Sequence, residues 1–364
     1  ECGAINLSQG FPDFQAEPAL FDAMHRYMLA GRNQYAPMAG LPELRQAIVD
    51  KVATLYGTRF DVESEVTVTA GATQAIFTAI AAFVRPGDEV LVFEPVYDSY
   101  VPAIETVGGK AVFAQLKFPD YAPDWAQVKS LINERTRMIV VNSPHNPTGS
   151  LLTAADLDRL ADLVRGTDIV ILSDEVYEHI LFDGERHASL CGHDELAARS
   201  IVVSSFGKTY HITGWKIGYV VGPAALMAEF RKVHQFNVFT VHAPSQLAIA
   251  EYMQDASRHL GLAAFYQEKR DVFRQLMAAT PFELLPCRGT YFQLARYDRI
   301  SDLPDRAFAE WMTREVGVAV IPVSVFNADG RDDKVVRFCF AKREETLQAA
   351  AERLGKVLSG NLSI

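Results

Sequence analysis

The sequence of 364 residues predicts an α/β fold: a large domain with a mostly parallel β-sheet covered by helices on both faces, and a smaller α+β domain. Between residues 65 and 221, short apolar strands alternate with helical patterns, which is typical of successive β-α-β units. Beyond residue 282 the strands become shorter and the alternation changes. The length exceeds what one hydrophobic core normally accommodates, so we expect two domains.

The N-terminal part combines irregular segments with two helices. Residues 5–14 are turn-rich, and residues 20–29 have an amphipathic helical pattern. Another loop covers residues 33–41. A second helix is expected from Pro42 to about Tyr56, because proline is favoured in the first turn of a helix.

The middle of the chain supplies the predicted sheet. Strands are expected at 65–69, 90–93, 111–116, 138–142, 168–172, 201–203 and 217–221. Helices are expected at 74–83, 99–107, 125–132 and after Thr153, which is a suitable N-cap. Only about a dozen residues without a helical pattern separate Val203 from Ile217, which is short for a parallel crossover. We therefore expect one antiparallel strand in an otherwise parallel sheet.

The C-terminal part predicts the smaller domain. Helical patterns at 244–253 and 262–277 precede short strands at 282–285, 290–294, 318–321 and 335–340. We assign residues 36–265 to the large domain, and residues 1–35 and 266–364 to the small domain with an N-terminal arm.

Composition excludes several classes of protein. With 35 basic and 45 acidic residues the net charge is −10, which disfavours nucleic acid or an anionic membrane as the main partner. No apolar run reaches the length of a membrane span. The four cysteines are scattered and predict reduced thiols of a cytoplasmic protein: Cys2, Cys191, Cys287 and Cys339. Three histidines lack metal-ligand spacing, so no metal site is expected: His179, His187 and His193.

Polar groups follow several of the predicted strands, and ligands of open α/β sheets bind at the carboxyl ends of strands. Lys208 stands beside a glycine just past a strand, where a site of low dielectric would lower the pKa of its amine and make it nucleophilic. The turn Gly71-Ala72-Thr73 at a helix start is suited to a phosphate. The other polar groups after strands are Tyr97, Asn146, Asp174, Tyr177 and Ser205.

Each group taken singly has an ordinary structural interpretation. Lys208 could be a solvated loop lysine and Asp174 a helix N-cap, and Tyr97 could be a core aromatic residue. Together, a phosphate cradle, an aromatic face, an acid for a pyridinium N–H and a lysine for a Schiff base predict a pyridoxal phosphate site. Arg337, in a predicted strand, could form a surface salt bridge, but in this context it suits bidentate binding of a substrate α-carboxylate.

Five segments carry a resemblance to a known family: SQGFPDF at 8–14, NQYAPMAG at 33–40, HNPTG at 145–149, SDEVYEHI at 173–180 and GKTYHITGWKIGY at 207–219. In this order they resemble the class I/II aminotransferases of the fold-type I pyridoxal phosphate family, most closely the methionine and kynurenine/glutamine aminotransferase branch. The pattern spans nearly the whole chain. The resemblance implies a mostly parallel seven-stranded sheet, the cofactor pyridoxal 5′-phosphate, and a homodimer with active sites at the subunit interface.

The resemblance also implies roles for residues. Lys208 would form the Schiff base and carry the proton that is transferred, Asp174 would pair with the pyridine nitrogen, and Tyr97 would stack on the ring. Tyr177 and Asn146 would bond the ring oxygen. Arg337, Asn146 and the backbone of Gly10 would clamp the substrate carboxylate. The phosphate would be held by Ala72, Thr73, Ser205 and Lys216, with Tyr35 of the partner subunit. Many members of the family have arginine at the position of Lys216. In this chain the bidentate guanidinium is therefore replaced by the single ammonium charge of lysine.

Aromatic residues indicate the substrate. An apolar pocket built from Phe11, Phe14, Tyr35 and Phe239, the last across the dimer interface, favours methionine, phenylalanine, tyrosine, kynurenine or glutamine as amino donor and a 2-oxo acid as acceptor. One alternative is a carbon–sulfur β-lyase with the same cofactor. A non-catalytic regulator that binds the cofactor is a second, although no basic helix-turn-helix is present. A nucleotide-binding protein is disfavoured because neither GxGxxG nor GxxxxGK[ST] follows a strand.

Overall fold

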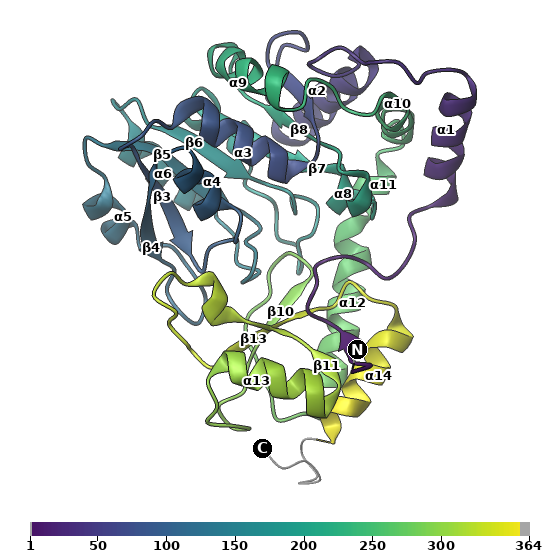
Figure 1. The fold of residues 1–364 in the computed structure, drawn as a ribbon, viewed down its shortest axis with the longest axis vertical. Helices are drawn as coiled ribbons and strands as arrows, with labels where there is room; N and C mark the ends of the chain where they lie inside the picture. Colours follow the sequence, from purple (N-terminus) through teal and green to yellow (C-terminus); the bar gives the residue numbers. More distant parts are fainter. Residues whose placement is uncertain (1, 357–364) are drawn as a thin grey trace.

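The computed structural model describes residues 2–356 and divides into a large α/β part and a smaller α+β part (Figure 1). Residue 1 and residues 357–364, which we assigned to the small domain, lie outside the described residues. The large sheet contains β2 (Val66–Thr69), β3 (Glu89–Glu94), β4 (Lys110–Gln115), β5 (Thr136–Asn142), β6 (Val170–Asp174), β7 (Ser200–Ser205) and β8 (Gly218–Val221). Its order is β2-β8-β7-β6-β5-β3-β4.

The strand directions confirm the prediction of a mostly parallel sheet. Strands β3 to β7 pair in parallel, whereas β8 is antiparallel to both of its neighbours, β7 and β2. The expected antiparallel strand is therefore β8. Every residue of β7 is buried, as expected for a strand whose two faces are both covered by helices.

Helices cover both faces of this sheet. The large part and its connections contain α1 (Pro18–Leu29), α2 (Pro42–Tyr56), α3 (Ala72–Phe83), α4 (Tyr100–Thr106), α5 (Trp125–Leu131), α6 (Ala154–Val164), α7 (Asp194–Ala197), α8 (Phe206–Thr209), α9 (Ala224–Asn237), α10 (Ala243–Tyr252), α11 (Ser257–Leu260) and α12 (Leu262–Met277), with 3-10 turns η1 (Leu190–Gly192) and η2 (Thr213–Trp215). Helix α6 begins at the predicted cap, where the Thr153 hydroxyl accepts from the Asp156 N–H and the Asp156 carboxylate accepts from the Thr153 N–H.

Alternate residues of the strands enter two separate cores. Ile201 and Val203 of β7 pack with apolar residues of α3 and α9, whereas Val202 joins the core beneath α2 and α6. This period of two is what a strand between two helical layers requires. The sheet is thereby fixed on both faces, and its carboxyl edge becomes a rigid mount for the side chains that follow each strand.

The small part is built on an antiparallel sheet of order β12-β13-β10-β9. Its strands and helices are β9 (Glu283–Leu284), β10 (Phe292–Arg296), β12 (Ile321–Pro322), β13 (Val335–Cys339), α13 (Asp305–Trp311) and α14 (Glu344–Gly355), with the π-helical turn η3 (Met312–Val316) and the 3-10 turn η4 (Val323–Phe326). Near the N-terminus, β1 (Ile5–Asn6) pairs in parallel with β11 (Val318–Ala319), so this strand lies with the small part (Figure 1). The chain then crosses to α1, which packs on α10.

Three local predictions differ from the structure, and helix α9 was not predicted. The segment 5–14, expected to be irregular, contains β1, and the segment before Ile217, expected to lack helix, contains the single turn α8. Strand β6 runs to Asp174, two residues beyond the predicted end. No prediction covered α9, because only Met227, Phe230 and His234 of its fourteen residues are buried and its apolar stripe is correspondingly short.

Candidate active site

A cavity of about 540 Å³ lies at the carboxyl edge of the large sheet, between the large and small parts. Eleven of the residues predicted for the site line it: Gly10, Ala72, Thr73, Tyr97, Asn146, Asp174, Tyr177, Ser205, Lys208, Lys216 and Arg337. They come from positions 10 to 337 of the chain, so the fold brings together groups that are far apart in the sequence.

Lys208 lies on the short helix α8, directly after β7. Its Nζ donates to the Gly10 carbonyl at 3.0 Å and to the Tyr291 hydroxyl at 2.8 Å. Burial lowers the pKa of Lys208 to about 8. A substantial fraction of the amine is therefore neutral at mildly alkaline pH, as a nucleophile or a base must be.

Asp174 closes β6 and is 4% exposed. The Tyr100 hydroxyl donates to its Oδ2 at 2.6 Å, and the Val176 N–H donates to its Oδ1 at 3.3 Å. Burial raises the pKa of Asp174 to about 6, although both hydrogen bonds act in the opposite direction. No described lysine or arginine forms an ion pair with this carboxylate, so a cationic N–H group of a ligand would find an unpaired buried acid.

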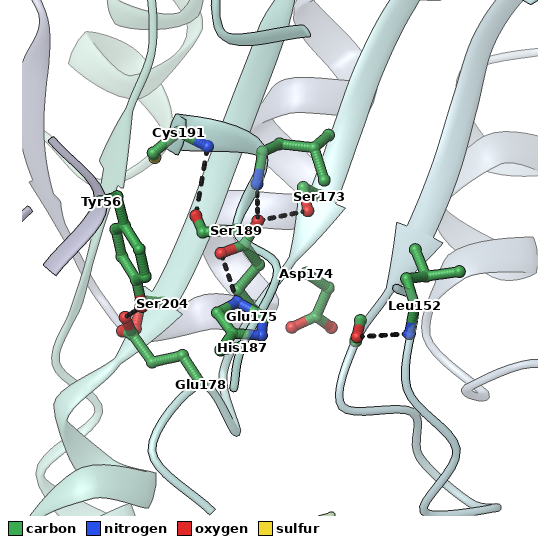
Figure 2. Close-up of polar contacts among 12 residues, drawn as sticks. Tyr56, Leu152, Ser173, Asp174, Glu175, Glu178, His187, Ser189, Cys191 and Ser204 are labelled. Atoms are coloured by element: carbon green, nitrogen blue, oxygen red, sulfur yellow. Dashed lines mark hydrogen bonds and ion pairs between the residues drawn. The ribbon is translucent and has the colours of Figure 1, made fainter. Parts of the chain in front are cut away.

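The segment that carries Asp174 and Tyr177 is anchored from behind by Glu175, as Figure 2 shows. The Glu175 carboxylate lies 2.7 Å from His187 Nε2 and accepts from the Ser173 hydroxyl at 2.8 Å. Because Glu175 points to the opposite side from Asp174, its bonds fix the backbone without entering the cavity.

Glu178 provides a second anchor on the same side. Lys51 donates to Oε1 at 2.6 Å. The Tyr56 hydroxyl donates to Oε2 at 2.6 Å, and the Ser204 hydroxyl donates to Oε1 (Figure 2). Burial alone would raise the pKa of Glu178, but Lys51 and the neighbouring His179 hold it well below its usual range. The contact with Ser204 ties the segment after β6 to β7, in which Ser205 follows Ser204.

An anion cradle lies at the start of α3. Gly71, with φ of 79°, precedes the helix, whose first N–H groups on Ala72 and Thr73 have no partner within the helix. Lys216 adopts the left-handed conformation with φ of 51°, and its Nζ lies 3.5 Å from the position that a Cβ on Gly71 would occupy. Lys216 forms no ion pair within residues 2–356. A helix N-terminus and an unpaired ammonium facing the same space fit a phosphate group.

Arg337 enters the cavity from β13 of the small part. Its Nη1 donates to Asn146 Oδ1 at 2.7 Å, its Nη2 donates to the Ser8 carbonyl at 3.1 Å, and its guanidinium lies 3.9 Å from the centre of the Phe292 ring. The buried Nε has no hydrogen-bond partner among the described residues. The bonds to Asn146 and Ser8 use two of the five N–H donors of the guanidinium, so donors remain for a carboxylate.

Tyr177 and Tyr97 supply aromatic faces. Tyr177 is buried, and its ring meets that of Tyr291 edge to face at 5.1 Å between centroids. Tyr97 follows β3 and is half-buried, with its ring 5.5 Å from that of Tyr100. Tyr97 therefore has an aromatic surface available to a planar ligand in the cavity.

Four predicted pocket residues are not among those that line the cavity of this chain. Phe11 is 43% exposed, and Phe14 packs against Phe265 with 5.5 Å between ring centroids. Tyr35 and Phe239 contact each other at 5.4 Å and are 82% and 40% exposed. Their proposed roles remain predictions.

Sequence reasoning missed residues that support or line the site. Asn142, Phe292 and Phe326 line the cavity, and Tyr100 and Tyr291 bond Asp174 and Lys208. Asn142 is the last residue of the strand predicted at 138–142, and Asp174 follows closely after the strand predicted at 168–172. The position of Asn142 could therefore have identified it as a candidate site residue. The sequence positions of Tyr100 and Tyr291 gave no such indication, because their hydroxyls reach the site only through the tertiary fold.

Within residues 2–356, no group of three or more His, Cys, Asp or Glu residues is arranged to hold a metal ion. None of the described helices is both long and apolar enough to cross a membrane. All four cysteines are free.

Comparison with known proteins identifies the family of the chain. Residues 3–354 match the family described as Aminotransferase class I and II. The chain is 49% identical to methionine aminotransferase of Escherichia coli (strain K12), covering 96% of this chain and 91% of the relative. It is 34% identical to kynurenine–oxoglutarate transaminase 1 of Rattus norvegicus, covering 98% and 92%.

Solved structures give the same result. The crystal structure of an Escherichia coli protein identified as a methionine aminotransferase superposes with a TM-score of 0.96 at 48% identity, covering 98% of this chain and 94% of that chain. The N-succinyldiaminopimelate aminotransferase of Mycobacterium tuberculosis superposes with a TM-score of 0.93 at 38% identity and the same coverage. The chain therefore belongs to the class I and II aminotransferases, with the fold-type I architecture, and is a transaminase of the kind that depends on pyridoxal phosphate.

Proposed function

We propose that the cavity binds pyridoxal 5′-phosphate and transfers the amino group of an apolar, aromatic or sulfur-containing amino acid to a 2-oxo acid. The observation that carries this proposal is one cavity that holds Lys208, whose pKa burial lowers to about 8, and Asp174, whose pKa burial raises to about 6, beside an anion cradle. A buried amine with a lowered pKa and a buried acid with a raised pKa in one cavity are typical of functional sites.

The donor set fits the cofactor group by group. Lys208 would attach it covalently through its amine, Asp174 would pair with the ring N–H, and Tyr97 would stack on the ring. Tyr177 and Asn146 would bond the ring oxygen. The phosphate would be held by Ala72, Thr73, Ser205 and Lys216. When bound, the cofactor supplies a cationic ring that stabilises negative charge at the substrate Cα.

The remaining steps belong to residues of the chain. Once the substrate amine has replaced it on the cofactor, the free Lys208 amine, whose pKa burial lowers to about 8, would accept a proton from the substrate Cα and, as an ammonium, donate it to the cofactor carbon that had carried the aldehyde. Arg337 and Asn146 orient the substrate carboxylate, and the Gly10 carbonyl fixes the amine from the other side. Phe292 and Phe326, on the small part, exclude water from the reacting groups.

The lining of the cavity supports an uncharged substrate side chain. On the small part it is apolar, with Phe292, Ile321, Val325 and Phe326, and among the described lining residues Arg337 is the single arginine. A second carboxylate would therefore lack a bidentate partner of this chain. The 49% identity to a methionine aminotransferase favours methionine as the amino donor. The other candidate donors are phenylalanine, tyrosine, kynurenine and glutamine.

The exposed aromatic patch supports a homodimer. Tyr35, Phe236 and Phe239 are 82%, 90% and 40% exposed, and large exposed apolar side chains in one place are typical of a protein interface. In this dimer Tyr35 of the partner subunit would complete the phosphate site and Phe239 would line the neighbouring pocket. Phe11 and Phe14 of the N-terminal arm would contribute to the apolar wall of the substrate pocket. We also propose a cytoplasmic location, since the four thiols are free. For the domains, we propose that residues 36–265 form the large domain.

A donor screen tests the proposal. The holoenzyme is given each amino acid with and without a 2-oxo acid, and both the new oxo acid and released ammonia are measured. We expect amino transfer that requires the acceptor, fastest with methionine or an aromatic donor, and none with Lys208→Ala. Ammonia and pyruvate released from a cysteine conjugate without an acceptor would instead identify a β-lyase, and no turnover with bound cofactor would identify a regulator.

A further inference from the structure

We propose that Tyr291 is a positioning residue for Lys208, and that its hydroxyl fixes the amine whenever that amine is not attached to the cofactor. This inference rests on the proposed function of Lys208. Tyr291 lies just before β10 and is fully buried.

Three polar atoms form a closed triangle in which each bond has a defined donor. The Tyr291 hydroxyl donates its single proton to the Gly10 carbonyl at 2.6 Å, so its oxygen is free to accept. Lys208 Nζ donates to that hydroxyl at 2.8 Å and to the same carbonyl at 3.0 Å. A neutral amine has two N–H groups, and both are used here. Its lone pair is therefore left for the cavity, where a proton is to be taken from carbon.

The backbone around Tyr291 is held in an unfavourable conformation. Thr290 is buried with φ of 65°, a left-handed value that is rare for a β-branched residue. Its N–H donates to the Ile180 carbonyl at 2.9 Å, and the Gly289 N–H donates to the Gly149 carbonyl at 2.9 Å. These bonds to the large part hold the strained turn, and strain that persists in this way is concentrated at functional sites.

The Gly10 backbone and the protonation state of the Tyr291 hydroxyl are also constrained. A Cβ on Gly10 would lie 2.6 Å from Phe292 Cζ, so only glycine allows this carbonyl to approach. Burial raises the pKa of Tyr291 well above its usual value, so the hydroxyl stays protonated and acts as a hydrogen-bond partner. The ionisable groups that face Lys208 from other elements are Asp174 of β6, Tyr177 in the segment after β6, Arg337 and Cys339 of β13, and Lys216 after η2.

The test compares two tyrosine-to-phenylalanine exchanges in the full-length apoprotein. Tyr291→Phe removes the hydroxyl from the triangle. Tyr266→Phe is the matched control, because Tyr266 is fully buried, its ring lies 5.6 Å from that of Tyr291, and its hydroxyl has no partner among the described residues. Acylation of Lys208 by acetic anhydride is followed against pH by peptide mass spectrometry, which gives the pKa of the amine without any cofactor.

A hydrogen bond accepted from an ammonium group stabilises the charged form, so its loss lowers the pKa. We expect the midpoint for Lys208 to fall by about one pH unit in Tyr291→Phe and to stay at the wild-type value in Tyr266→Phe. A midpoint that moves no further in Tyr291→Phe than in Tyr266→Phe would overturn the inference. Because no cofactor is present, this result is independent of whether the chain binds pyridoxal phosphate.

Two further measurements strengthen the test. In the holoenzyme, Tyr291→Phe should slow the half-reaction with methionine about ten-fold at unchanged donor affinity, with a larger isotope effect for Cα-deuterated methionine. If the variant does not fold, 3-fluorotyrosine is placed at position 291. Its ¹⁹F resonance should titrate with Lys208 and lose that titration in Lys208→Met; a resonance indifferent to Lys208 would contradict the proposed contact.

Discussion

Replacing Lys51 by methionine tests whether the buried pair behind the site holds it in place. The Lys51 and Glu178 side chains are 6% and 2% exposed, and Lys51 Nζ lies 2.6 Å from Glu178 Oε1 and 2.7 Å from the Tyr219 hydroxyl. The exchange leaves a buried carboxylate without its cation. Removal of one partner of such a pair typically costs about 3–5 kcal/mol. The Tyr56 and Ser204 hydroxyls still donate to Glu178 in the variant, so we expect a cost near the lower end of this range.

The assay is urea unfolding of the apoprotein at fixed protein concentration. Arg165→Met is the control, because Arg165 is 60% exposed and pairs with surface carboxylates, so its loss should cost less than about 1 kcal/mol. The double variant Lys51→Met/Glu178→Gln should recover much of the loss, since the buried charge is then absent.

The pH dependence has a definite sign. In the wild type the pKa of Glu178 is below its unfolded value, so the stabilisation is complete above the unfolded pKa and disappears as pH falls through the folded pKa. Without Lys51, burial raises this pKa instead. The difference between Lys51→Met and the wild type should therefore shrink as the solution is acidified toward pH ~4. A loss below about 1 kcal/mol, or a larger loss that is independent of pH, would refute this reasoning.

Three further exchanges probe the cavity. Arg337→Lys replaces a bidentate guanidinium by a single ammonium charge, so KM for methionine should rise about ten-fold or more. The reaction with an amine that lacks a carboxylate should be unaffected, and equal effects on both substrates would contradict carboxylate binding by Arg337. Asp174→Asn should retain covalent cofactor but slow amino transfer about 10²-fold or more, measured in single turnovers. Gly10→Ala should lower the free energy of unfolding by about 1–3 kcal/mol, since its Cβ would lie 2.6 Å from Phe292 Cζ, whereas Gly214→Ala, with no atom near its Cβ, should be nearly neutral.

Sequence patterns predicted the sheet well because its strands are buried on both faces. Runs such as MIVV before Asn142 have almost no polar residue, and the residue types after each strand mark the ligand-binding edge. The short crossing between Val203 and Ile217 correctly indicated an antiparallel strand.

Features that depend on tertiary contacts escaped prediction. The single turn α8 is too short to show a period, although it carries Lys208. The bonds from Tyr100 and Tyr291 join residues 74 and 83 positions apart, and no local pattern records such a distance. The roles of Tyr35 and Phe239 depend on a second subunit, which the sequence of one chain indicates only through its resemblance to relatives.

The central claim is that the Lys208 amine holds the cofactor. The full chain is incubated with pyridoxal 5′-phosphate, reduced with borohydride and digested, and the peptides are analysed by mass spectrometry. The account predicts one modified peptide, containing Lys208, with its formation rising through pH ~8 and with no such product in Lys208→Ala. Stoichiometric modification of a different lysine, or none at Lys208 in the wild-type chain, would contradict it.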